Sequence, residues 1–498
     1  MAEENDEQYL RALGYSQQLF REMGGFSNFA ISFSIISILT GAVLLYGYGL
    51  KLAGPIVNSV GWPLVSVMTL AVAASMAEIA SAYPTAGGLY FWALRLGGRG
   101  WGWITAWMNM IGQVTITAGI NIGAAIYLIG AATSILGLPA RPLYTTWSFQ
   151  VAVMVLIMIP QVLINIYGIR ITARLNDISV WWHIGGVAAI TILLALLGKH
   201  RNDAAFLFSF LPSAKPDTTM VIGDHTFPSL LLRLVPALRG VYAAAPPALL
   251  FVLALLQAQW TYTGYDASAH VAEETKMARL NSAWGIFLSV AVSAVAGYVM
   301  LLVLTWCIPN RNVMRTAMDP YPVLYIVAQN LPRAFADAIA IIIGGAMWLC
   351  GAASVTSMAR MWYAFARDDG MPGAALIKRV GTRHTPVWSI VITSVLAVAV
   401  CLYAAAYTIV TSISTIALYA AYVIPIWLNF RRRLPREITP WNMGRFAPLV
   451  NAIAIAWCVV IAVVFVLPPN ELVLWTMVAL VALMAAYWFG GARRRFVR

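Results

Sequence analysis

The chain has 498 residues, of which 61% are hydrophobic and only 10% are charged. A soluble globular domain carries roughly 25% charged residues, so this sequence has too few of them to cover a water-facing surface. The formal net charge of +13 does not indicate nucleic-acid binding, because Lys and Arg lie between apolar runs rather than on one basic face or arm. The composition predicts one all-α polytopic membrane protein surrounded mainly by lipid.

Twelve apolar stretches are long enough to cross a bilayer, which takes roughly 20 helical residues. In chain order they are Phe26–Leu50, Ile56–Ala80, Trp101–Gly130, Thr145–Tyr167, Ile178–Leu197, Ala248–Glu274, Ala283–Cys307, Ala338–Met358, Val387–Ala406, Ile409–Leu428, Leu449–Leu467 and Leu472–Phe489. Their even number puts both termini on one side. That side receives 22 of the 32 Lys and Arg residues, against 10 on the other. Because basic residues favour the cytoplasmic side, we expect cytoplasmic termini and a location in the cell inner membrane.

The longest connection, from Lys199 to Pro247, lies between the fifth and sixth stretches. Within it, Ser229 to Tyr242 is amphipathic, which predicts a helix lying on the outer membrane surface. A role of this helix in gating is the alternative.

The segment from Met1 to Arg21 is acidic and polar, and it does not resemble a secretory signal sequence.

Two of the predicted spans are poor candidates for uninterrupted helices. The first contains SFSIISILTG, from Ser32 to Gly41, and the sixth contains WTYTGYD, from Trp260 to Asp266. Helix propensity is low there, and the hydroxyl groups compete for backbone partners. One span opens each half of the chain, which is typical of inverted-repeat transporters with paired broken helices. The alternative is that these small residues serve only close helix packing.

Paired breaks would form a site for a zwitterion. A break inside lipid persists only where it faces a cavity or a solute, because an unpaired backbone group costs several kcal/mol there. Free N–H groups at the start of one half-helix attract an anion, and free carbonyls at the end of the other attract a cation. An α-amino acid is the simplest ligand of this kind. No cluster of acidic residues accompanies the breaks, which argues against a polyamine.

Four segments carry a resemblance to a known family. They are QAQWTYTGYDASAHVAEET (Gln257–Thr275), FSNFAISFSIISILTG (Phe26–Gly41), EIASAYPTAGGLYFW (Glu78–Trp92) and RMWYAFARDDGMPG (Arg360–Gly373). With them the chain resembles the amino acid–polyamine–organocation superfamily of permeases, and most of all its amino acid/choline branch, which includes γ-aminobutyrate and choline permeases. The resemblance implies a five-plus-five inverted repeat of the LeuT type with two further C-terminal helices. The first repeat would then be 26–200 and the second 247–430, joined by an extracellular loop, 201–246. A cytoplasmic N-terminal segment (1–25) precedes them, and two further helices (431–490) and a basic cytoplasmic tail (491–498) follow.

The resemblance also implies the residues that hold the solute. The amides that meet a substrate carboxylate would be those of the first break, Ser37, Ile38, Leu39, Thr40 and Gly41. The carbonyls that help to meet the substrate amine would be those of the sixth span, Trp260, Thr261, Tyr262, Thr263 and Gly264. Tyr265 falls where related permeases carry an aromatic gate residue. The segment from Lys199 to Pro247 looks longer than is usual in this branch.

His183 is a charged or chargeable residue well inside the fifth span, where such residues need a reason. Proton-coupled relatives carry Lys at the matching position, facing the broken first helix. A positive charge there can replace the sodium ion of sodium-coupled members, and histidine titrates in the physiological range. We therefore expect either proton coupling through His183, with Na⁺ the less favoured ion, or a neutral histidine bonded to a backbone carbonyl.

Other ionisable residues lie near the ends of spans. Asp266 follows the sixth-span break, and we expect it to cap the second half-helix rather than to contact the solute. An inner gate of ion pairs would combine acidic residues with Arg360 or Arg367, the acidic candidates being Glu78, Glu273 and Glu274. Solvated end charges are the alternative. We expect His270 to be a packing residue. Asn109, Gln113 and Asn121 share one helical face that either lines the pathway or joins helices.

These patterns favour a secondary active transporter that moves a small amino acid or similar zwitterion by alternating access. The motifs HExxH, GxxxxGK[ST] and GxSxG are missing, as is any metal-spaced Cys/His cluster, so we expect no enzyme, no metal and no cofactor. A choline or polyamine carrier, an amino acid exchanger and a transporter-like nutrient sensor are alternatives. The predicted partners are the solute and membrane lipids, with no nucleic acid and no obligate protein partner.

Overall fold

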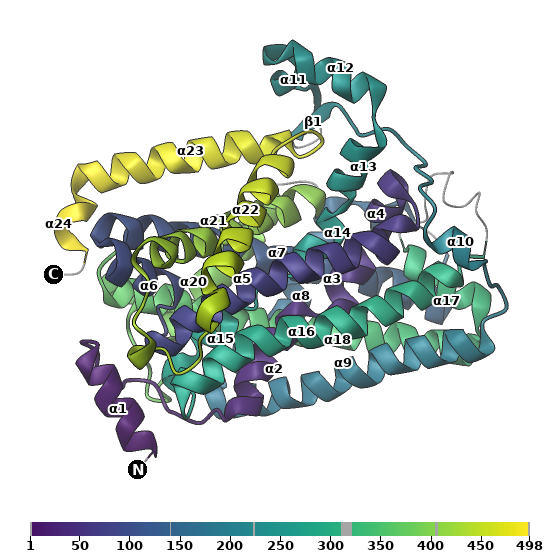
Figure 1. Ribbon diagram of the computed structural model, residues 1–498. Helices are drawn as coiled ribbons and strands as arrows, with labels where there is room; N and C mark the ends of the chain where they lie inside the picture. The colour runs from purple at the N-terminus through teal and green to yellow at the C-terminus, as the bar shows by residue number, and fades with distance from the viewer. Residues whose placement is uncertain (1, 140, 223–224, 310–320, 404–406, 497–498) are drawn as a thin grey trace.

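The computed structural model describes residues 2–139, 141–222, 225–309, 321–403 and 407–496. Long helices dominate it (Figure 1). They are α5 (Trp62–Ala82), α7 (Arg99–Leu136), α8 (Trp147–Tyr167), α9 (Ile169–Leu197), α16 (Ala278–Trp306), α18 (Arg333–Arg367), α20 (Val387–Tyr403), α21 (Tyr407–Arg432), α22 (Ala447–Val464) and α23 (Glu471–Tyr487).

The first and sixth spans are built from shorter helices. The first consists of α2 (Gly25–Ile36), α3 (Ile38–Leu44) and α4 (Tyr46–Ala53), and the sixth of α13 (Pro247–Ala254), α14 (Leu256–Thr261) and α15 (Ala267–His270). The remaining elements are α1 (Ala2–Ala12), η1 (Val57–Gly61), α6 (Leu89–Gly97), η2 (Pro142–Thr145), α10 (Ala204–Leu207), β1 (Thr219–Ile222), β2 (His225–Pro228), α11 (Leu230–Leu234), α12 (Pro236–Ala244), η3 (Ala272–Glu274), α17 (Pro322–Asn330), α19 (Ala374–Ile377), η4 (Arg436–Ile438), η5 (Gly444–Phe446), η6 (Trp488–Ala492) and α24 (Arg493–Arg495).

The structure confirms an all-α polytopic membrane protein. Ten helical segments of the described residues are long and apolar enough to cross a membrane. The two expected spans outside this set are the ninth, where α20 is an apolar helix of 17 residues, and the sixth, where α13 and α14 follow a 92° bend from α12 and then end at a break. Each of the twelve predicted spans therefore corresponds to helical structure.

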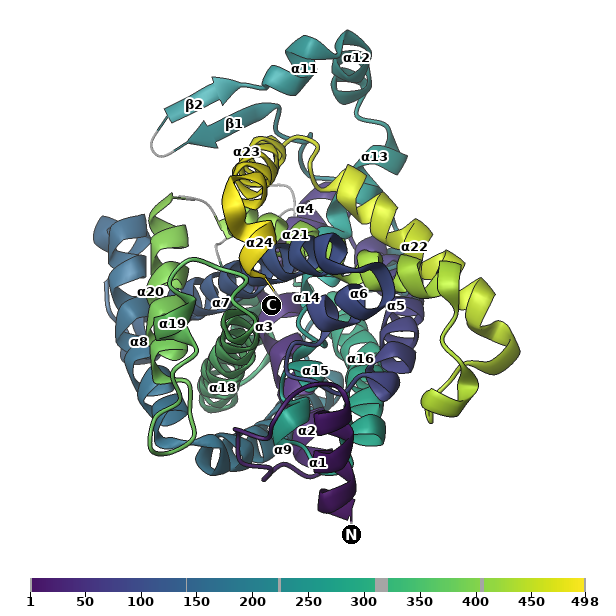
Figure 2. The same ribbon diagram turned by 90° about the vertical axis from the view of Figure 1, so that its left-hand side faces the viewer.

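Burial separates an inner set of helices from an outer set. The first span and helices α5, α7, α18 and α21 are mostly buried, whereas α8, α9, α16, α22 and α23 expose much of their apolar surface. Figure 2 shows α3, α7 and α18 inside a ring that includes α8, α9, α16 and α22. Because the exposed sides of the outer helices are apolar, lipid rather than water suits them.

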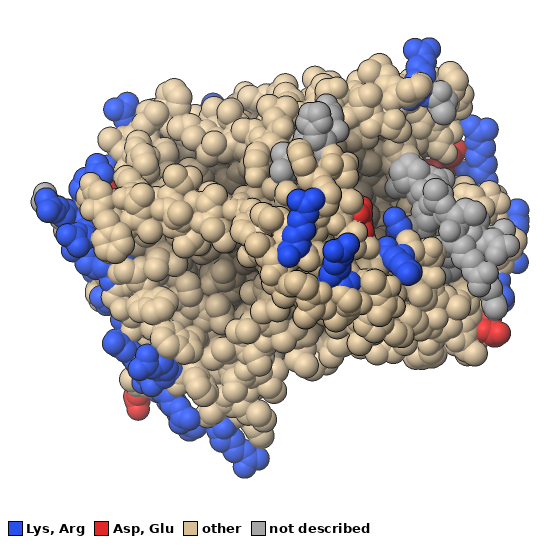
Figure 3. Space-filling model, turned by 90° about the horizontal axis from the view of Figure 1, so that it is seen from above, with Lys and Arg blue, Asp and Glu red and all other residues tan. Residues whose placement is uncertain are grey.

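Both termini lie at the same end of the molecule, here called the termini end, as an even number of crossings requires (Figure 1). α10 lies at the opposite end, here called the loop end, whereas the hairpin, α11 and α12 stand at the top of the view in Figure 1. In Figure 3, Lys and Arg side chains crowd the termini end, the part of the broad face next to it is uncharged, and further basic side chains lie near the middle of the face and at the opposite end.

The long connection contains more structure than the sequence analysis predicted. The amphipathic stretch forms two short helices, α11 and α12, and an antiparallel pairing of β1 with β2 precedes them. This segment is fastened to the start of α23, where Glu471 accepts the amide of Leu231 at 2.6 Å. Tyr242 also donates to the carbonyl of Pro468 at 2.6 Å. These bonds hold α11 and α12 against the chain that leads into α23.

The first and sixth spans touch at two glycines. A Cβ added to Gly41 in α3 would lie 2.8 Å from the Cα of Thr261 in α14. A Cβ added to Gly264 would lie 2.3 Å from Cγ2 of Ile35 in α2, and Gly264 also has a φ of +84°. Only glycine adopts that backbone conformation at this contact without strain. Close packing of the two spans thus depends on both residues.

Substituting Gly264→Ala is expected to destabilise the protein by about 1–3 kcal/mol, because it adds both backbone strain and a steric clash. The measurement is the thermal unfolding midpoint of the purified protein in detergent. Gly185→Ala in α9 is the matched control, because a Cβ there meets no heavy atom within 4 Å. Equal midpoints for the two variants would contradict the packing described here.

Candidate functional site

The break in the first span is a single residue, narrower than the five residues predicted. Ser37 has a left-handed φ of 32° and separates α2 from α3. The amides of Thr40 and Gly41 bond to the carbonyl of Ser37, so both residues are already helical. Ile38 and Leu39 are therefore the residues whose amides, at the start of α3, have no partner within that helix.

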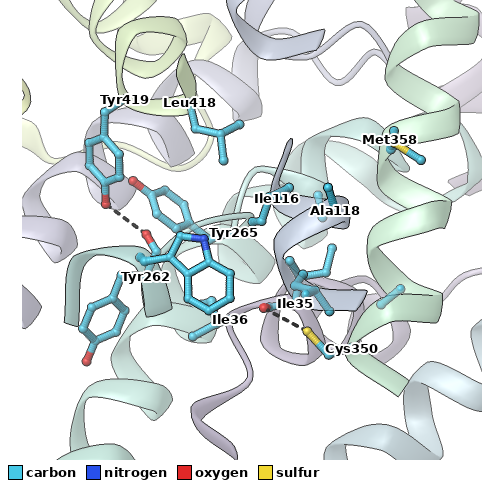
Figure 4. Close-up of a cluster of buried hydrophobic side chains, with 14 of the residues drawn as sticks. Ile35, Ile36, Ile116, Ala118, Tyr262, Tyr265, Cys350, Met358, Leu418 and Tyr419 are labelled. Atoms are coloured by element: carbon cyan, nitrogen blue, oxygen red, sulfur yellow. Dashed lines mark hydrogen bonds between the residues drawn. The ribbon is translucent and has the colours of Figure 1, made fainter. Parts of the chain in front are cut away.

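The break in the sixth span lies two residues later than predicted. Trp260 and Thr261 belong to α14, and the chain is non-helical or turned from Tyr262 to Asp266. Side chains satisfy two of the freed carbonyls. The hydroxyl of Tyr419 in α21 donates to the carbonyl of Tyr262 at 2.9 Å (Figure 4), and Thr263 donates to the carbonyl of Trp260 at 2.5 Å.

Tyr265, the predicted aromatic gate residue, is fully buried where the two spans meet. Its ring lies 5.1 Å from the ring of Tyr422, and its carbonyl accepts from Ser32 in α2 at 2.8 Å. Figure 4 shows it among Tyr419, Ile35 and other buried apolar side chains near the break. The ring thus belongs to the interface between the two broken spans.

His183 lies beside the break of the first span, as the resemblance implied. Its Nε2 is 2.7 Å from the hydroxyl of Ser37, and its Nδ1 is 2.7 Å from the carbonyl of Ser179. The same Ser37 hydroxyl is 2.6 Å from that of Thr40. The imidazole is 1% exposed, so any change in its charge would act directly on the break.

Asp266 does not cap the second half-helix, and that prediction is wrong. Although Asp266 precedes α15, its carboxylate accepts none of the amides of that helix. Instead, Tyr422 donates to Oδ1 at 2.8 Å, Gln113 donates to Oδ2 at 3.0 Å, and Nε2 of His270 lies 3.1 Å from Oδ2. His270 is consequently more than a packing residue. Partners from three helices hold this carboxylate.

The predicted ion pairs form at the termini end. Arg367 makes two hydrogen bonds with Glu273, at 2.9 and 2.8 Å. Arg360 contacts Glu274 at 3.1 and 3.3 Å, and both of these side chains are fully buried. Glu78 is not part of this group. It accepts from Asn429 at 3.4 Å and from the amide of Met443 at 3.3 Å, so its predicted place in the gate is wrong.

Sequence reasoning missed the N-terminal segment, which covers these ion pairs. Met23 pairs in parallel with Thr275, directly after Glu274. Gln17 donates to the carbonyl of Glu273 at 2.8 Å, and Arg21 donates to the carbonyl of Thr275. The contacts are more than 240 residues apart in sequence, and only the polarity of the segment hinted that it would lie outside the membrane.

Tyr15 and Asp368 extend this cover. The guanidinium of Arg367 stacks 4.1 Å from the ring of Tyr15, and the Tyr15 hydroxyl donates to Asp368 at 2.8 Å. Tyr90 donates to the same carboxylate at 3.1 Å. Burial raises the pKa of the Asp368 carboxyl, while Arg367 and the two hydroxyls oppose that shift.

The polar face of α7 joins helices. Gln113 reaches Asp266, and Asn109 lies 3.2 Å from Nε2 of His270. Asn121 donates to the carbonyl of Thr117 within its own helix. Within the part of the chain that the structure describes, no group of three or more His, Cys, Asp or Glu residues has the arrangement of a metal site.

Comparison with known proteins agrees with this architecture. Residues 23–488 match the family described as amino acid permease. The chain is 32% identical to the amino-acid permease BAT1 of Arabidopsis thaliana, with 98% of this chain and 95% of that protein covered. It is 33% identical to the rice BAT1 homolog, over 92% and 87% of the two chains. A putative amino acid/polyamine transporter of Macrophomina phaseolina is 28% identical, over 88% and 93%. The chain thus belongs to the amino acid permease family.

Proposed function

We propose that this permease is a secondary carrier for a small zwitterionic amino acid, which it binds between the breaks of the first and sixth spans. The observation that carries the proposal is the contact of the two breaks inside the bundle. Gly41 lies against Thr261, and Gly264 lies against Ile35. The start of α3 and the end of α14 are therefore close neighbours.

The two helix ends differ in polarity. At the start of α3, the amides of Ile38 and Leu39 form the positive end of a helix that continues through α4. At the end of α14, the carbonyl of Tyr262 accepts a hydrogen bond from the Tyr419 hydroxyl. A carboxylate suits the first end. An ammonium group suits the end of α14, where its N–H groups would replace the hydroxyl that donates to this carbonyl.

Movement across the membrane would then alternate between two closed ends. The ion pairs of Arg367 with Glu273 and of Arg360 with Glu274, under the N-terminal segment, form the gate of the termini end in this proposal. The excess of basic residues at this end favours the cytoplasmic side of the cell inner membrane. The structure then corresponds to a carrier closed toward the cytoplasm.

Proton coupling through His183 is part of the proposal. The imidazole bonds to Ser37, so a proton gained there would bring positive charge to the amides that face the substrate carboxylate. Such a charge would take the place of a sodium ion. The inverted-repeat organisation remains a prediction that the broken spans support, and the amino acid/choline branch remains a prediction from the sequence resemblance.

The test of the proposed function is a ligand screen followed by counterflow in proteoliposomes. A neutral amino acid at a hundredfold its Kd should add about 2.7 kcal/mol of apparent stability in a thermal-shift assay. The same compound should drive uptake of its labelled form. Stabilisation only by choline or polyamines would contradict the substrate class. Stabilisation without counterflow would favour a sensor over a carrier.

The buried gate pair should matter far more than an exposed pair. Glu273 is fully buried and Arg367 is 12% exposed, so Arg367→Gln leaves an uncompensated buried carboxylate and should cost about 3 kcal/mol of stability. Neutralising both residues, with Glu273→Gln added, should recover most of that loss. The measurement is the unfolding midpoint of each variant together with its uptake rate.

Lys378→Gln is the matched control for that experiment. Lys378 pairs with Asp369 at 2.7 Å, but the two side chains are 37% and 52% exposed, so the expected change is below about 1 kcal/mol. An Arg367→Gln variant as stable and as active as Lys378→Gln would refute a buried gate at this position.

His183→Ala should slow uptake at least tenfold and flatten its pH dependence, because it removes the titratable group beside Ser37. Initial uptake rates between pH 5 and 8 provide the measurement. His200→Ala is the control, since His200 is an exposed residue of the loop end. A His183→Ala protein with the original rate and pH profile would rule out coupling at this site.

A further inference from the structure

A chain of buried polar contacts leads from the break of the sixth span to the ion pairs of the termini end. It begins at Gly264, whose amide faces the Tyr422 hydroxyl at 3.4 Å, and passes from that hydroxyl to Asp266. From Asp266 it continues to His270, 3.1 Å away. Asp266, His270 and Tyr422 are all fully buried.

His270 has an oxygen acceptor at each ring nitrogen. Its Nδ1 lies 3.2 Å from the carbonyl of Ala86, and its Nε2 lies 3.1 Å from Oδ2 of Asp266. A neutral imidazole carries one N–H and can donate to only one of them. The other contact would place a nitrogen lone pair against an oxygen lone pair. With an ionised Asp266, both contacts are hydrogen bonds only when the ring carries a second proton.

The same geometry is satisfied if the extra proton sits on the carboxylate. A protonated Asp266 can donate to Nε2 while Nδ1–H donates to Ala86. The two forms differ only in which side of the hydrogen bond holds the proton. In either form the pair holds one proton more than a neutral histidine beside a carboxylate.

Neighbouring groups do not remove this requirement. Asn109 lies 3.2 Å from Nε2, and its Oδ1 has no hydrogen-bond partner among the described residues. Its amide could face the ring with either atom, yet Nε2 and Oδ2 would still oppose each other at 3.1 Å. Gln113 from α7 and Tyr422 from α21 are already donors to Asp266. A proton between the two residues would make this contact a hydrogen bond.

The buried carboxylates that follow α15 are each paired with a guanidinium. η3 follows α15 directly and contributes two carboxylates, each of which is matched by a guanidinium of α18: Glu273 by Arg367 and Glu274 by Arg360. The partners that α2 offers to α15 are uncharged, since Ser32 and Asn28 bond to Ser268 and its backbone. Because these two ion pairs are each neutral, the proton changes the charge of the Asp266 and His270 pair itself.

His183 does not impose the same requirement. Its Nδ1 can donate to the Ser179 carbonyl while its Nε2 accepts from the Ser37 hydroxyl, which is able to donate. A neutral ring fits these contacts, and among the described residues the ring bonds to Ser37 and Ser179 but to no carboxylate. The contacts of His183 are thus satisfied by a neutral ring, whereas those of His270 include a carboxylate.

One residue, Ala86, connects His270 to the gate through its two backbone groups. The carbonyl of Ala86 accepts from His270, and the amide of the same residue donates to Glu273 at 3.0 Å. Glu273 in turn holds Arg367. A Cβ at Gly88, which has a φ of +47°, would lie 3.3 Å from the His270 ring, so the loop between α5 and α6 packs on the imidazole. Loss of the proton would weaken one of the two bonds of His270 and loosen this loop.

We propose that Asp266 and His270 form a proton-binding site that, when occupied, holds the termini end closed and whose release accompanies opening. This inference rests on the proposed function. While the termini end is closed, one proton reaches the pair from the loop-end side. The same proton leaves at the termini end when the bond from His270 to Ala86 breaks. The site is distinct from His183 and links the substrate break directly to the gate.

The test measures the number of protons moved per substrate in proteoliposomes, from a trapped pH dye and from labelled substrate. With one proton at this pair and one at His183, the wild-type ratio should be about two. His270→Gln and Asp266→Asn should each lower it to about one, whereas the control His200→Gln should keep the wild-type ratio. A ratio that stays at about two in both site variants would overturn the inference.

A wild-type measurement covers the case in which a variant fails to fold. The amide hydrogen exchange of residues 83–88 and 272–275, corrected for its intrinsic pH dependence, should become at least tenfold faster as the pH rises. The increase should follow the loss of a single proton. Exchange without such a step would overturn the proton site. Counterflow without any proton movement by the wild type would overturn this inference and leave the carrier function intact, whereas no counterflow with any amino acid would overturn both.

Discussion

Backbone groups freed where a helix breaks inside a membrane must find partners within the protein, and this constraint organises the whole interior. The sixth span is broken over several residues, and its partners come from elsewhere in the bundle. Tyr419 and Tyr422 of α21 and Ser32 of α2 bond to its backbone. The break is therefore tied to helices on both sides. A solute that replaced one of these donors would change the hold of α21 on the sixth span.

The same constraint separates charge from the apolar bundle. The buried charged groups near the break and the termini end occur as neighbours: Asp266 with His270, Glu273 with Arg367 and Glu274 with Arg360. An isolated charge there would be costly, while a pair is tolerated where further hydrogen bonds complete it. Gln113, Tyr422 and the Ala86 amide supply those bonds. Opening the gate must exchange these partners for water.

Local sequence patterns predicted what depends on local properties. Apolar length predicted the spans, and Gly and hydroxyl residues predicted both breaks to within two residues, because helix propensity is set locally. The partners of Asp266 were not predictable in this way. Tyr422 is 156 residues away and Gln113 is 153 away, so no spacing reveals them. Glu78 was misassigned for the same reason, since Met443 and Asn429 lie on a distant part of the chain.

Three contacts that converge on Glu273 suggest how the termini end opens. Its carboxylate binds Arg367 and the Ala86 amide, and its carbonyl accepts from Gln17 of the N-terminal segment. These partners belong to α18, to the loop before α6 and to the chain before α2. None can withdraw without leaving a buried group of Glu273 short of a partner, because this side chain is inaccessible to water. Separation of the three elements is thus energetically coupled, and a gate built this way opens as one unit rather than contact by contact.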